Sequence, residues 1–573
     1  MSAEKLITDH IDIWTSAVKA KSSSGRGSSK KRELYGIMKL RELILELAVY
    51  GKLTSETSFQ GRSKEIILKA ADEKRALAKE RKIRADKEVY QSLARSDFPS
   101  DWEIVCIGQI AHVLGGKRVP KGCKLLEQPT DFVYLRVTDM KNRTIDESDL
   151  RYISEDVFKQ ISRYTIHTED VYVTIAGTIG AVGSIPPHLD GMSLTENAAK
   201  LVFRGISKEY IIVVLQSDFV KKQFNDAVNQ MAQPKLSLNS IKHTLIPIPS
   251  IEEQHRIVAK VDELMALCDQ LEQQTEASLD AHQVLVETLL ATLTNSQDAT
   301  ELMANWARIS EHFDTLFTTE QSIDTLKQTI LQLAVMGKLV AQDPNDEPAA
   351  KLLERIAEEK AQLVKEKKIK KQKALPPISE DEKPFELPNG WEWCRFGTLV
   401  NFKAELVRPE EHLDLDQVAP DSIEKGTGKL IKRRTVAESG VKGPNSRFYA
   451  GQILYSKIRP SLSKAIIAEF DGLCSADMYP LEAMVNSEFL LKIILSEVFL
   501  TQVRAAENRI KMPKLNVDSL SNILVPICPD NEMGRISSKL SELMFVSDQL
   551  KQRINKIQQT QLQMTDAIVE LAL

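Results

Sequence analysis

The sequence predicts an α+β protein in which two mixed α/β domains are separated by long antiparallel coiled-coil helices and related by a pseudo-two-fold repeat. The repeat is directly visible, because LELAVYGKL at 45–53 returns as LQLAVMGKL at 331–339, 286 residues later. Each copy is followed by a charged helical stretch, a segment of short β-like runs and a long heptad pattern, in the same order. A spacing this large exceeds the period of about 20–50 residues found in solenoids and indicates a duplicated module. Two similar halves suggest a target or partner that is itself paired.

Three further pairs of segments extend the repeat. The sequence between the last two pairs diverges strongly, whereas the flanking helical stretches match better, as expected if the two domains recognise different things on a shared scaffold. The pairs are EKRALAKERKIRADK around Ile83 with EEKAQLVKEKKIKKQK around Ile369, FPSDWEIVCIG at Trp102 with LPNGWEWCRFG at Trp391, and PKLSLNSIKHTLIPIP at Pro234 with PKLNVDSLSNILVPIC at Pro513.

The first copy predicts its elements in order. The first residues show the spacing of a short amphipathic helix, and the linker KSSSGRGSSKKR that follows is rich in Ser, Gly and positive charge. Gly51 stands where the C′ glycine of the next helix is expected. We therefore expect helices at 4–19 and 31–53, a charged helix at about 64–94, and a β-rich segment at about 102–249.

A heptad pattern follows each β-rich segment and predicts two long helices. Such an apolar stripe must be covered, because each buried Leu or Ile contributes roughly 1.5–3 kcal/mol. The helices that precede the two β-rich segments are the obvious partners, although two unrelated amphipathic helices on separate cores would give the same pattern. The predicted buried positions are Ile257, Val261, Leu264, Cys268 and Leu271 in the first copy, and Ile536, Leu540, Leu543, Ser547, Leu550, Ile554, Ile557, Gln561, Met564, Ile568 and Leu571 in the second.

The second half repeats the plan of the first. Residues 298–325 join the halves as helix, and a charged helix is expected at 347–373 before the Pro-rich hinge ALPPISEDEKPFELP. The predicted division of the chain is an N-terminal helix and linker at 1–35, a first helical region at 36–96, a β-rich domain at 97–249, a long helix at 250–297, a connecting and second helical region at 298–384, a second β-rich domain at 385–528 and a long helix at 529–573.

Composition excludes several classes of protein. The net charge of −4 over 573 residues is unlike that of a protein that coats nucleic acid, so any DNA binding must use local patches. The six cysteines include no CxxC pair, which argues against a zinc site and is typical of a reducing cytosol. Acidic residues interrupt the N-terminal apolar residues, and no apolar run approaches membrane-spanning length. We expect a cytoplasmic protein.

Catalytic and cofactor motifs are missing from the sequence. It has no GxxxxGK[ST] phosphate loop and no HExxH. GTIGAVG at 177–183 has the wrong spacing for a dinucleotide loop and is better explained as a glycine turn between strands. SIPPH at 184–188 resembles the Asn-Pro-Pro-aromatic motif of DNA amino-methyltransferases, but Ile185 replaces the Asn and His188 the aromatic. We therefore expect no catalytic residue, metal site or bound cofactor in this chain.

Several motifs together resemble one known family over nearly the whole chain. PIPSIEEQHRIVAKVDELMALCDQLEQ at 247–273 is close to a signature of the specificity subunit of type I DNA restriction–modification systems. KLRELILELAVYGKL at 39–53, DVYVTIAGTIGAVGS at 170–184 and ELPNGWEWCRFG at 386–397 are also typical of it, and the opening segment resembles the type IB branch. In the second copy PICPDNEMGRIS is a looser match.

The resemblance implies an architecture and a set of partners. Two target-recognition domains would each read one half of a bipartite, asymmetric sequence in double-stranded DNA, and the paired helices would fix the unread spacer. The helices would also dock two methyltransferase subunits, which bind S-adenosylmethionine, and two restriction/translocase subunits that use ATP and Mg²⁺ would complete the complex. The chain itself would be a non-catalytic subunit. A coiled-coil scaffold that binds only proteins remains the alternative.

Basic and amide side chains near the expected loops are the candidates for DNA contacts. Residues 403–465 hold twelve Lys and Arg against eight Asp and Glu, a local excess that could face phosphates, while Arg, Lys, Asn and Gln also read base edges. For any single residue a solvated surface charge is an equally simple explanation. The candidates are Lys117, Arg118, Lys121, Arg136, Gln230, Gln233 and Lys235 in the first domain, and Lys432, Arg433, Arg434, Lys457, Arg459, Lys464, Asn508, Arg509, Lys511 and Lys514 in the second.

Overall fold

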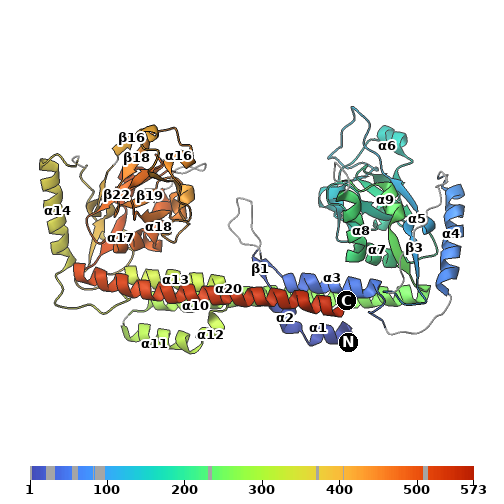
Figure 1. Cartoon of the computed structure of the whole chain (residues 1–573), viewed down its shortest axis with the longest axis horizontal. Coiled ribbons are helices and arrows are strands. Elements are labelled where there is room, and N and C mark those ends of the chain that lie inside the picture. The colour runs from blue at the N-terminus through green and yellow to red at the C-terminus, as the bar shows by residue number, and fades with distance from the viewer. Residues whose placement is uncertain are drawn as a thin grey trace. The chain divides into compact units, whose positions relative to one another are not determined.

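The computed structural model of the chain describes residues 3–20, 32–54, 62–81, 83, 97–229, 235–297, 299–369, 373–403, 405–506 and 514–573. These residues form two compact units (Figure 1). Unit 1 consists of Met1–Ser278 with Ile557–Leu573, and unit 2 of Leu279–Lys556. Each unit combines one β-rich domain with a base of helices, which confirms the predicted α+β class and the repeat. The unit borders cut both long helices, so they do not coincide with the segment boundaries expected from sequence.

The helical base of unit 1 begins with two short helices rather than the single helix predicted at 4–19. α1 covers Ala3–Thr8 and α2 covers Ile11–Ser16, and His10 has the non-helical N-cap conformation between them. The same break occurs in unit 2 between α11 and α12, where His312 is the N-cap and ISEHFDTL matches ITDHIDIW of the first copy. The repeat therefore includes this helical hairpin, which sequence analysis missed. The base continues with β1 (Lys19–Ala20), β2 (Arg32–Glu33), α3 (Tyr35–Val49) and α4 (Arg62–Glu80).

Gly51 and Gly337 end the repeated helices in the left-handed conformation, with φ of 67° and 70°, as predicted for C′ glycines. A second reason for glycine comes from packing. A Cβ on Gly51 would lie 2.5 Å from Pro99, and a Cβ on Gly337 would lie 2.6 Å from Pro388, with the repeated tryptophans Trp102 and Trp391 beside them. Each glycine thus lets the end of a base helix touch the start of a β-rich domain.

The described residues of the β-rich domain of unit 1 form two larger sheets and the two-stranded pairs β3-β13 and β6-β7. One of the larger sheets has the order β10-β9-β12-β4 with antiparallel neighbours, and the other the order β5-β11-β8, in which β5 and β11 are parallel. Every residue of β9 and β12 is buried, so these strands form the centre of the domain. Its strands are β3 (Glu103–Cys106), β4 (His112–Gly115), β5 (Tyr134–Leu135), β6 (Met140–Lys141), β7 (Thr144–Ile145), β8 (Thr165–Ile166), β9 (Val171–Thr174), β10 (Val182–Gly183), β11 (Met192–Leu194), β12 (Ala198–Val202) and β13 (Leu245–Ile248), and its helices are α5 (Ile107–Ile110), α6 (Glu155–Ile161), α7 (Lys208–Gln216), α8 (Asp218–Asn229) and α9 (Leu238–His243).

Unit 2 repeats the main features of this topology, but its described residues add β16 to the second sheet and have no counterpart of the β6-β7 pair. Its first sheet has the order β15-β22-β19-β20, and its second the order β16-β18-β21-β17 with β17 and β21 parallel. Its strands are β14 (Glu392–Arg395), β15 (Val400–Phe402), β16 (Glu405–Val407), β17 (Asp416–Val418), β18 (Asn445–Phe448), β19 (Ile453–Ser456), β20 (Ala465–Ile467), β21 (Gly472–Cys474), β22 (Met478–Ala483) and β23 (Leu524–Ile527), and its helices are α11 (Ala299–Glu311), α12 (Phe313–Leu316), α13 (Glu320–Val335), α14 (Ala349–Lys365), α15 (Phe396–Leu399), α16 (Val436–Ser439), α17 (Ser487–Leu495), α18 (Glu497–Ala506) and α19 (Val517–Asn522).

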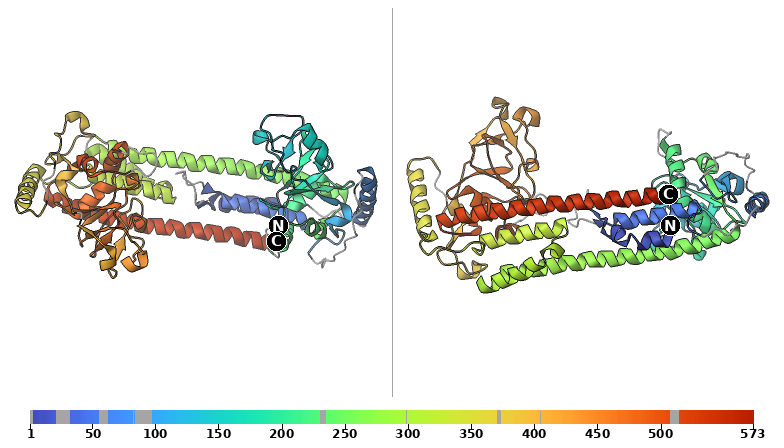
Figure 2. Two further views of the ribbon diagram at one scale, coloured as in Figure 1. Left: turned by 90° about the horizontal axis from the view of Figure 1, so that it is seen from above. Right: turned by 60° about the horizontal axis from the view of Figure 1, so that its bottom comes forward.

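The two long helices are α10 (Ile251–Asn295) and α20 (Asp530–Ala572), of 45 and 43 residues. In unit 1, Arg41 of α3 donates to Asp269 of α10 at 2.6 Å, and Tyr35 of α3 donates to Asp566 of α20 at 2.6 Å. In unit 2, Lys327 of α13 donates to Asp548 of α20 at 2.6 Å. The helices that precede the β-rich segments are therefore the partners of the long helices, as predicted. Figure 2 shows α3 between the parts of α10 and α20 that belong to unit 1, where the two long helices run antiparallel.

The buried stripe of α20 departs from the predicted heptad positions toward its end. Ile536, Leu540 and Ile554 are buried as predicted, but Ile557 is 57% exposed, Met564 46% and Leu571 88%. The stripe instead continues through Thr565, one position later than Met564, which is fully buried. An α-helix needs about 3.6 residues per turn, so a straight helix moves its buried face by about 20° per heptad. Five heptads accumulate a shift of about one residue, which accounts for the difference.

No described helix is both long and apolar enough to cross a membrane.

Candidate nucleic-acid interface

Each β-rich domain is attached to its base by polar contacts that recur in the repeat. Lys74 of α4 donates to the carbonyl of Gly108, and Lys360 of α14 donates to the carbonyl of Gly397 at 2.7 Å. Burial lowers the pKa of the Lys360 ammonium group to about 8. The side chain of Gln502 exchanges two hydrogen bonds with the backbone of Leu524, at 2.7 and 2.8 Å. The two lysine contacts fix the orientation of each domain on the helices of its own unit, whereas the Gln502 contact lies within the β-rich domain of unit 2.

Three loops meet at one end of each domain, and we call this end the tip. In unit 1 the tip consists of 175–181, 195–197 and 235–236. The N–H of Ile175 donates to the carbonyl of Asn197 at 2.8 Å, and the carbonyl of Ile175 accepts the N–H of Leu236 at 2.9 Å. In unit 2 it consists of 457–464, 475–477 and 514–515, joined by equivalent bonds of Lys457 to Asp477 and Leu515, both at 2.9 Å. Divergent loops are thus held by the same backbone connections.

The tip of unit 2 brings together three of the predicted residues. The Lys457 ammonium group lies 5.1 Å from the centre of the Tyr479 ring, and Lys514 forms an ion pair with Asp477 at 3.0 Å. Ile458 and Lys514 form a β-bridge, which places Arg459 beside the strand that carries Lys514. Arg459 is exposed. An exposed cluster of two lysines and an arginine around a single carboxylate offers donors for phosphate oxygens or base edges.

Arg459 has a backbone conformation that glycine normally adopts. Its φ is 45°, and Gly177, which follows the equivalent strand in unit 1, has a φ of 79°. A non-glycine residue in the left-handed region costs roughly 1–2 kcal/mol. Such strain clusters at functional sites, where a side chain is needed at that position. The GTIGAVG segment that contains Gly177 is a turn between β9 and β10, as predicted.

The basic loop of the first domain also reaches a tip. The N–H of Lys117 donates to Leu194 at 2.9 Å, and Arg118 forms an ion pair with Glu196 at 2.6 Å. The Tyr134 hydroxyl donates to the carbonyl of Lys117 at 2.8 Å, and burial raises the pKa of this tyrosine to about 12. Gly116 lets the loop that carries Lys117 approach the backbone of Thr195, since a Cβ at Gly116 would lie 2.0 Å from the carbonyl oxygen of Thr195. Lys121 and Lys235 are exposed near the same tip.

Four other predicted residues are held by contacts within their domain. Arg136 is paired with Asp139 at 2.7 Å and with Asp149 at 3.2 Å. The Arg433 guanidinium pairs with Asp416 at 2.7 Å and lies 4.3 Å from the Phe470 ring centre, while Arg434 pairs with Asp421 at 3.1 Å. Lys464 donates to the carbonyl of Pro420 at 2.6 Å. A structural role is the simpler account of Arg136, Arg434 and Lys464, whereas Lys432 is exposed and Arg433 is 63% exposed despite its ion pair.

The remaining candidates cannot be placed. Gln230, Gln233, Asn508, Arg509 and Lys511 lie outside the described residues. Sequence analysis also missed the acidic members of the tips, Glu196 and Asp477, which orient the cations. The available signal was a polar turn between two apolar runs, in LTENAAK and CSADMYP. Within the described part of the chain, no group of three or more His, Cys, Asp or Glu could hold a metal ion.

The chain contains two copies of an α/β domain, each attached to a helical base and each with basic side chains at its tip. This arrangement defines a protein with two similar binding domains. The family described as "Type I restriction modification DNA specificity domain" matches residues 99–281. The chain is 39% identical to the type I restriction enzyme EcoAI specificity subunit of Escherichia coli and 36% identical to the EcoEI specificity subunit of the same organism, in both cases over 100% of both chains. The solved HsdS subunit from Thermoanaerobacter tengcongensis is 17% identical, with a TM-score of 0.40 over 84% of this chain and 99% of that one. The chain therefore belongs to the family of type I restriction enzyme specificity subunits, which are not themselves catalytic.

Proposed function

We propose that this specificity subunit reads a bipartite, asymmetric DNA sequence, with the tip of each β-rich domain taking one half-site. The observation that carries the proposal is that both tips have the same backbone connections but different side chains. Lys117 and Arg118 occupy one tip, and Lys457, Arg459 and Lys514 the other. Phosphate contacts would set affinity, and base contacts, worth about 1–3 kcal/mol each when bidentate, would set the recognised sequence.

The long helices suit the role of a spacer ruler. At 1.5 Å per residue, helices of 45 and 43 residues are about 65 Å long. Half-sites one turn of duplex apart are separated by roughly 34–36 Å. Continuous helices of this length could hold two readers over such a distance, so we propose that α10 and α20 determine the length of the unread spacer.

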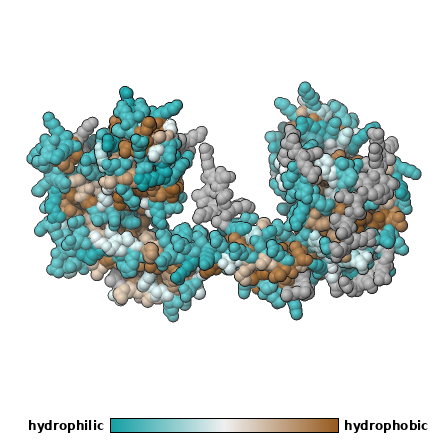
Figure 3. All heavy atoms as spheres, in the orientation of Figure 1, coloured by the Kyte–Doolittle hydropathy of each residue, from teal (hydrophilic) through white to brown (hydrophobic). Residues whose placement is uncertain are grey.

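Repeated apolar positions on the long helices support docking of two like subunits. Leu267 of α10 and Val546 of α20 occupy equivalent positions of the repeat. Their side chains are 42% and 48% exposed, and Phe545, next to Val546, is 64% exposed. Apolar side chains also gather on the helical base of unit 1 (Figure 3). Exposed apolar positions of this kind mark protein-binding surfaces. We propose that two methyltransferase subunits dock there, and that two restriction/translocase subunits complete the complex.

In this proposal the partner subunits, and not the specificity subunit, bind all the cofactors. S-adenosylmethionine would be bound by the methyltransferase subunits, and ATP with Mg²⁺ by the restriction/translocase subunits. The specificity subunit would contribute recognition and assembly in the cytoplasm of a bacterium or archaeon.

Selective binding is the direct test of the proposal. The chain purified with its methyltransferase subunit should bind a duplex carrying the sequence found by methylome sequencing of the host far better than a scrambled duplex. Replacing residues 102–249 with the domain of a relative should change only one half-site. Equal binding to all duplexes would favour the coiled-coil scaffold, and a change in both half-sites would contradict the two-reader arrangement.

A further inference from the structure

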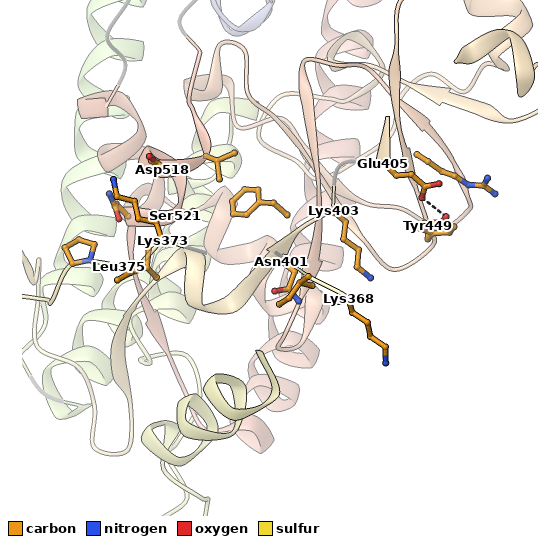
Figure 4. A pocket seen from close by; sticks show the side chains of 16 residues that line it. Lys368, Lys373, Leu375, Asn401, Lys403, Glu405, Tyr449, Asp518 and Ser521 are labelled. Atoms are coloured by element: carbon orange, nitrogen blue, oxygen red, sulfur yellow. Dashed lines mark hydrogen bonds between the residues drawn. The ribbon is translucent and has the colours of Figure 1, made fainter. Parts of the chain in front are cut away.

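A groove with a volume of 790 Å³ runs along the β15 edge of the sheet β15-β22-β19-β20 in unit 2, and its lining includes none of the residues assigned to the tip (Figure 4). Asn401, Phe402 and Lys403 of β15 and its extension line one side, and the segment from Lys373 to Pro376 lines the other. The groove extends past Tyr449 at one end and Asp518 at the other. Its length and its strand-lined wall distinguish it from a compact small-molecule pocket.

The wall of the groove is an outer strand on which Phe402 carries the available backbone groups, because the carbonyl of Val400 on the same edge already accepts the Lys360 ammonium group at 2.8 Å. β15 is the first strand in the order β15-β22-β19-β20. The N–H of Lys403 donates to Pro480 at 3.3 Å and the N–H of Met484 donates to Leu399 at 2.8 Å, so residues 399, 401 and 403 direct their backbone groups toward β22. Phe402 lies between them, and its N–H and C=O therefore point away from β22. Neither group has a hydrogen-bond partner in the described part of the chain.

The charge lining the groove is mainly positive. Lys368, Lys373, Lys403 and Arg447 line it together with only two acidic residues, Glu405 and Asp518. Glu405 already accepts the Tyr449 hydroxyl at 3.0 Å. Lys403 pairs with Glu482 at 2.8 Å, yet its side chain is 45% exposed, so that pair is weakened by solvent. The cations are spread along the groove, which suits an extended ligand with several negative charges.

The floor of the groove favours a peptide over nucleic acid. Apolar side chains of Ile369, Leu375, Phe402 and Val517 line the groove together with the cations. A duplex is about 20 Å wide and cannot enter a groove of this volume, and single strands bind chiefly by stacking on free aromatic faces. The Tyr449 ring lies 5.4 Å from the Arg447 guanidinium, and Phe402 packs edge-on against Tyr479 at 5.8 Å. These rings are therefore poor stacking platforms.

We propose that this groove binds an extended acidic peptide segment of a partner protein, which adds a strand to β15. Backbone hydrogen bonds to Phe402 would supply affinity, alternate apolar side chains would enter the floor, and the intervening carboxylates would meet Lys373 and Lys403. This inference is independent of the proposed DNA reading, because it uses none of the tip residues.

The test measures fluorescence anisotropy of the full chain with a labelled ten-residue peptide in which Glu alternates with Val and Leu. Binding is expected to weaken about tenfold in the double variant Lys373→Glu, Lys403→Glu, because the lining charge is reversed. The exposed Lys442→Glu, outside the groove, should leave binding unchanged. A peptide with N-methyl groups on alternate residues, which cannot donate to β15, should bind about tenfold more weakly to the unaltered chain.

Three outcomes would overturn the proposal. Equal binding of the Glu peptide and of a peptide with Lys in place of Glu would show that the groove does not select acidic peptides. Undiminished binding of the N-methylated peptide would exclude the addition of a strand to β15. Displacement of the probe by oligothymidylate, with no effect of the N-methyl groups, would assign the groove to single-stranded nucleic acid. Sequence-specific duplex binding by the groove variant should remain intact, so failure here is distinguishable from failure of the proposed DNA reading.

Discussion

Lys52 and Lys338 occupy the same position in the two repeats, and each donates from Nζ to main-chain oxygens at the C-terminal end of a long helix. Lys52 donates to a terminal oxygen of Leu573, the residue after α20, in unit 1. Lys338 donates to Thr294 at 2.9 Å and to Ser296 at 2.8 Å at the end of α10, in unit 2. A lysine at this place satisfies carbonyls left without intrahelical partners and interacts favourably with the negative end of the helix dipole. The repeated GKL motif therefore anchors the end of the other copy's long helix in both units.

Replacing these lysines should loosen the ends of the long helices. Lys338→Met is expected to cost about 1–2 kcal/mol, because a charged donor to two carbonyls is lost at a half-buried position. Lys52 is exposed, so Lys52→Met should cost less. Hydrogen exchange of the last two turns of α10 and of α20 would report the two effects separately. Lys442→Met, on the exposed surface of the second β-rich domain, is the control and should leave the hydrogen exchange of both helix ends unchanged. If both helix ends were equally protected from exchange in all variants, the capping role would be contradicted.

The two C′ glycines give a second prediction. Gly337→Ala should destabilise unit 2 by about 2–4 kcal/mol, since a Cβ in the left-handed region is unfavourable and would also press on Pro388 and Trp391. Gly51→Ala should have a similar effect in unit 1. Gly443→Ala is the matched control, because nothing lies within 4 Å of its Cβ position. Thermal unfolding monitored by tryptophan fluorescence would compare them, and a neutral Gly337→Ala would show that the junction adjusts.

Glu46 and Gln332 occupy the same position in the two repeats, so they allow the pH dependence of stability to be compared between a carboxyl group and an amide. Glu46 is 5% exposed and accepts the N–H groups of Asp218 and Phe219 at the start of α8, at 2.5 and 3.1 Å. Burial raises the pKa of this carboxyl group in the folded chain, so the folded state binds more protons than the unfolded state. Its contribution to stability is present below the ordinary pKa of about 4.5 and is lost as pH rises through the folded-state pKa.

Glu46→Gln should therefore flatten the pH dependence of unfolding above pH 4.5, as measured by urea midpoints between pH 4 and 8. The second copy already has Gln332, whose Oε1 is buried without a hydrogen-bond partner in the described part of the chain. Gln332→Glu should introduce a loss of stability with rising pH where none existed. Identical pH profiles for the wild type and Glu46→Gln would mean that the buried carboxyl is not protonated on folding.

Much of the scaffold was predictable from sequence because it is encoded by local patterns that occur twice. The glycines at 51 and 337, the β-rich segments and the long helices follow from turn chemistry and periodicity. The shift of the buried stripe of α20 to Thr565 was not predictable, because the heptad pattern alone does not show that the helix is straight. The break at His10 was missed for a similar reason, since the apolar spacing continues across it.

The tips were predicted only in part, because their geometry depends on long-range backbone connections. The sequence indicated that Lys117, Arg118, Lys457 and Arg459 lie in basic loops, but not that Glu196 and Asp477 stand beside them. It also did not distinguish these residues from Arg136 and Arg434, whose side chains are paired inside the domain. A charged residue and its partner far along the chain can be matched only once the sheet order is known.

Arg459 offers a prediction in which stability and DNA binding change in opposite directions. Glycine is favoured at a φ of 45°, and Gly177 occupies the equivalent position in the other domain. Arg459→Gly should therefore stabilise unit 2 by about 1 kcal/mol, while it weakens binding to the cognate duplex by about 1–3 kcal/mol and reduces the salt dependence of binding if the lost contact is to a phosphate. Arg459→Ala separates the two effects, because it loses the guanidinium but retains the strained backbone. Thermal unfolding and duplex titrations at two salt concentrations would measure both quantities, and a stabilised variant with unchanged DNA affinity would show that the strain at Arg459 serves something other than recognition.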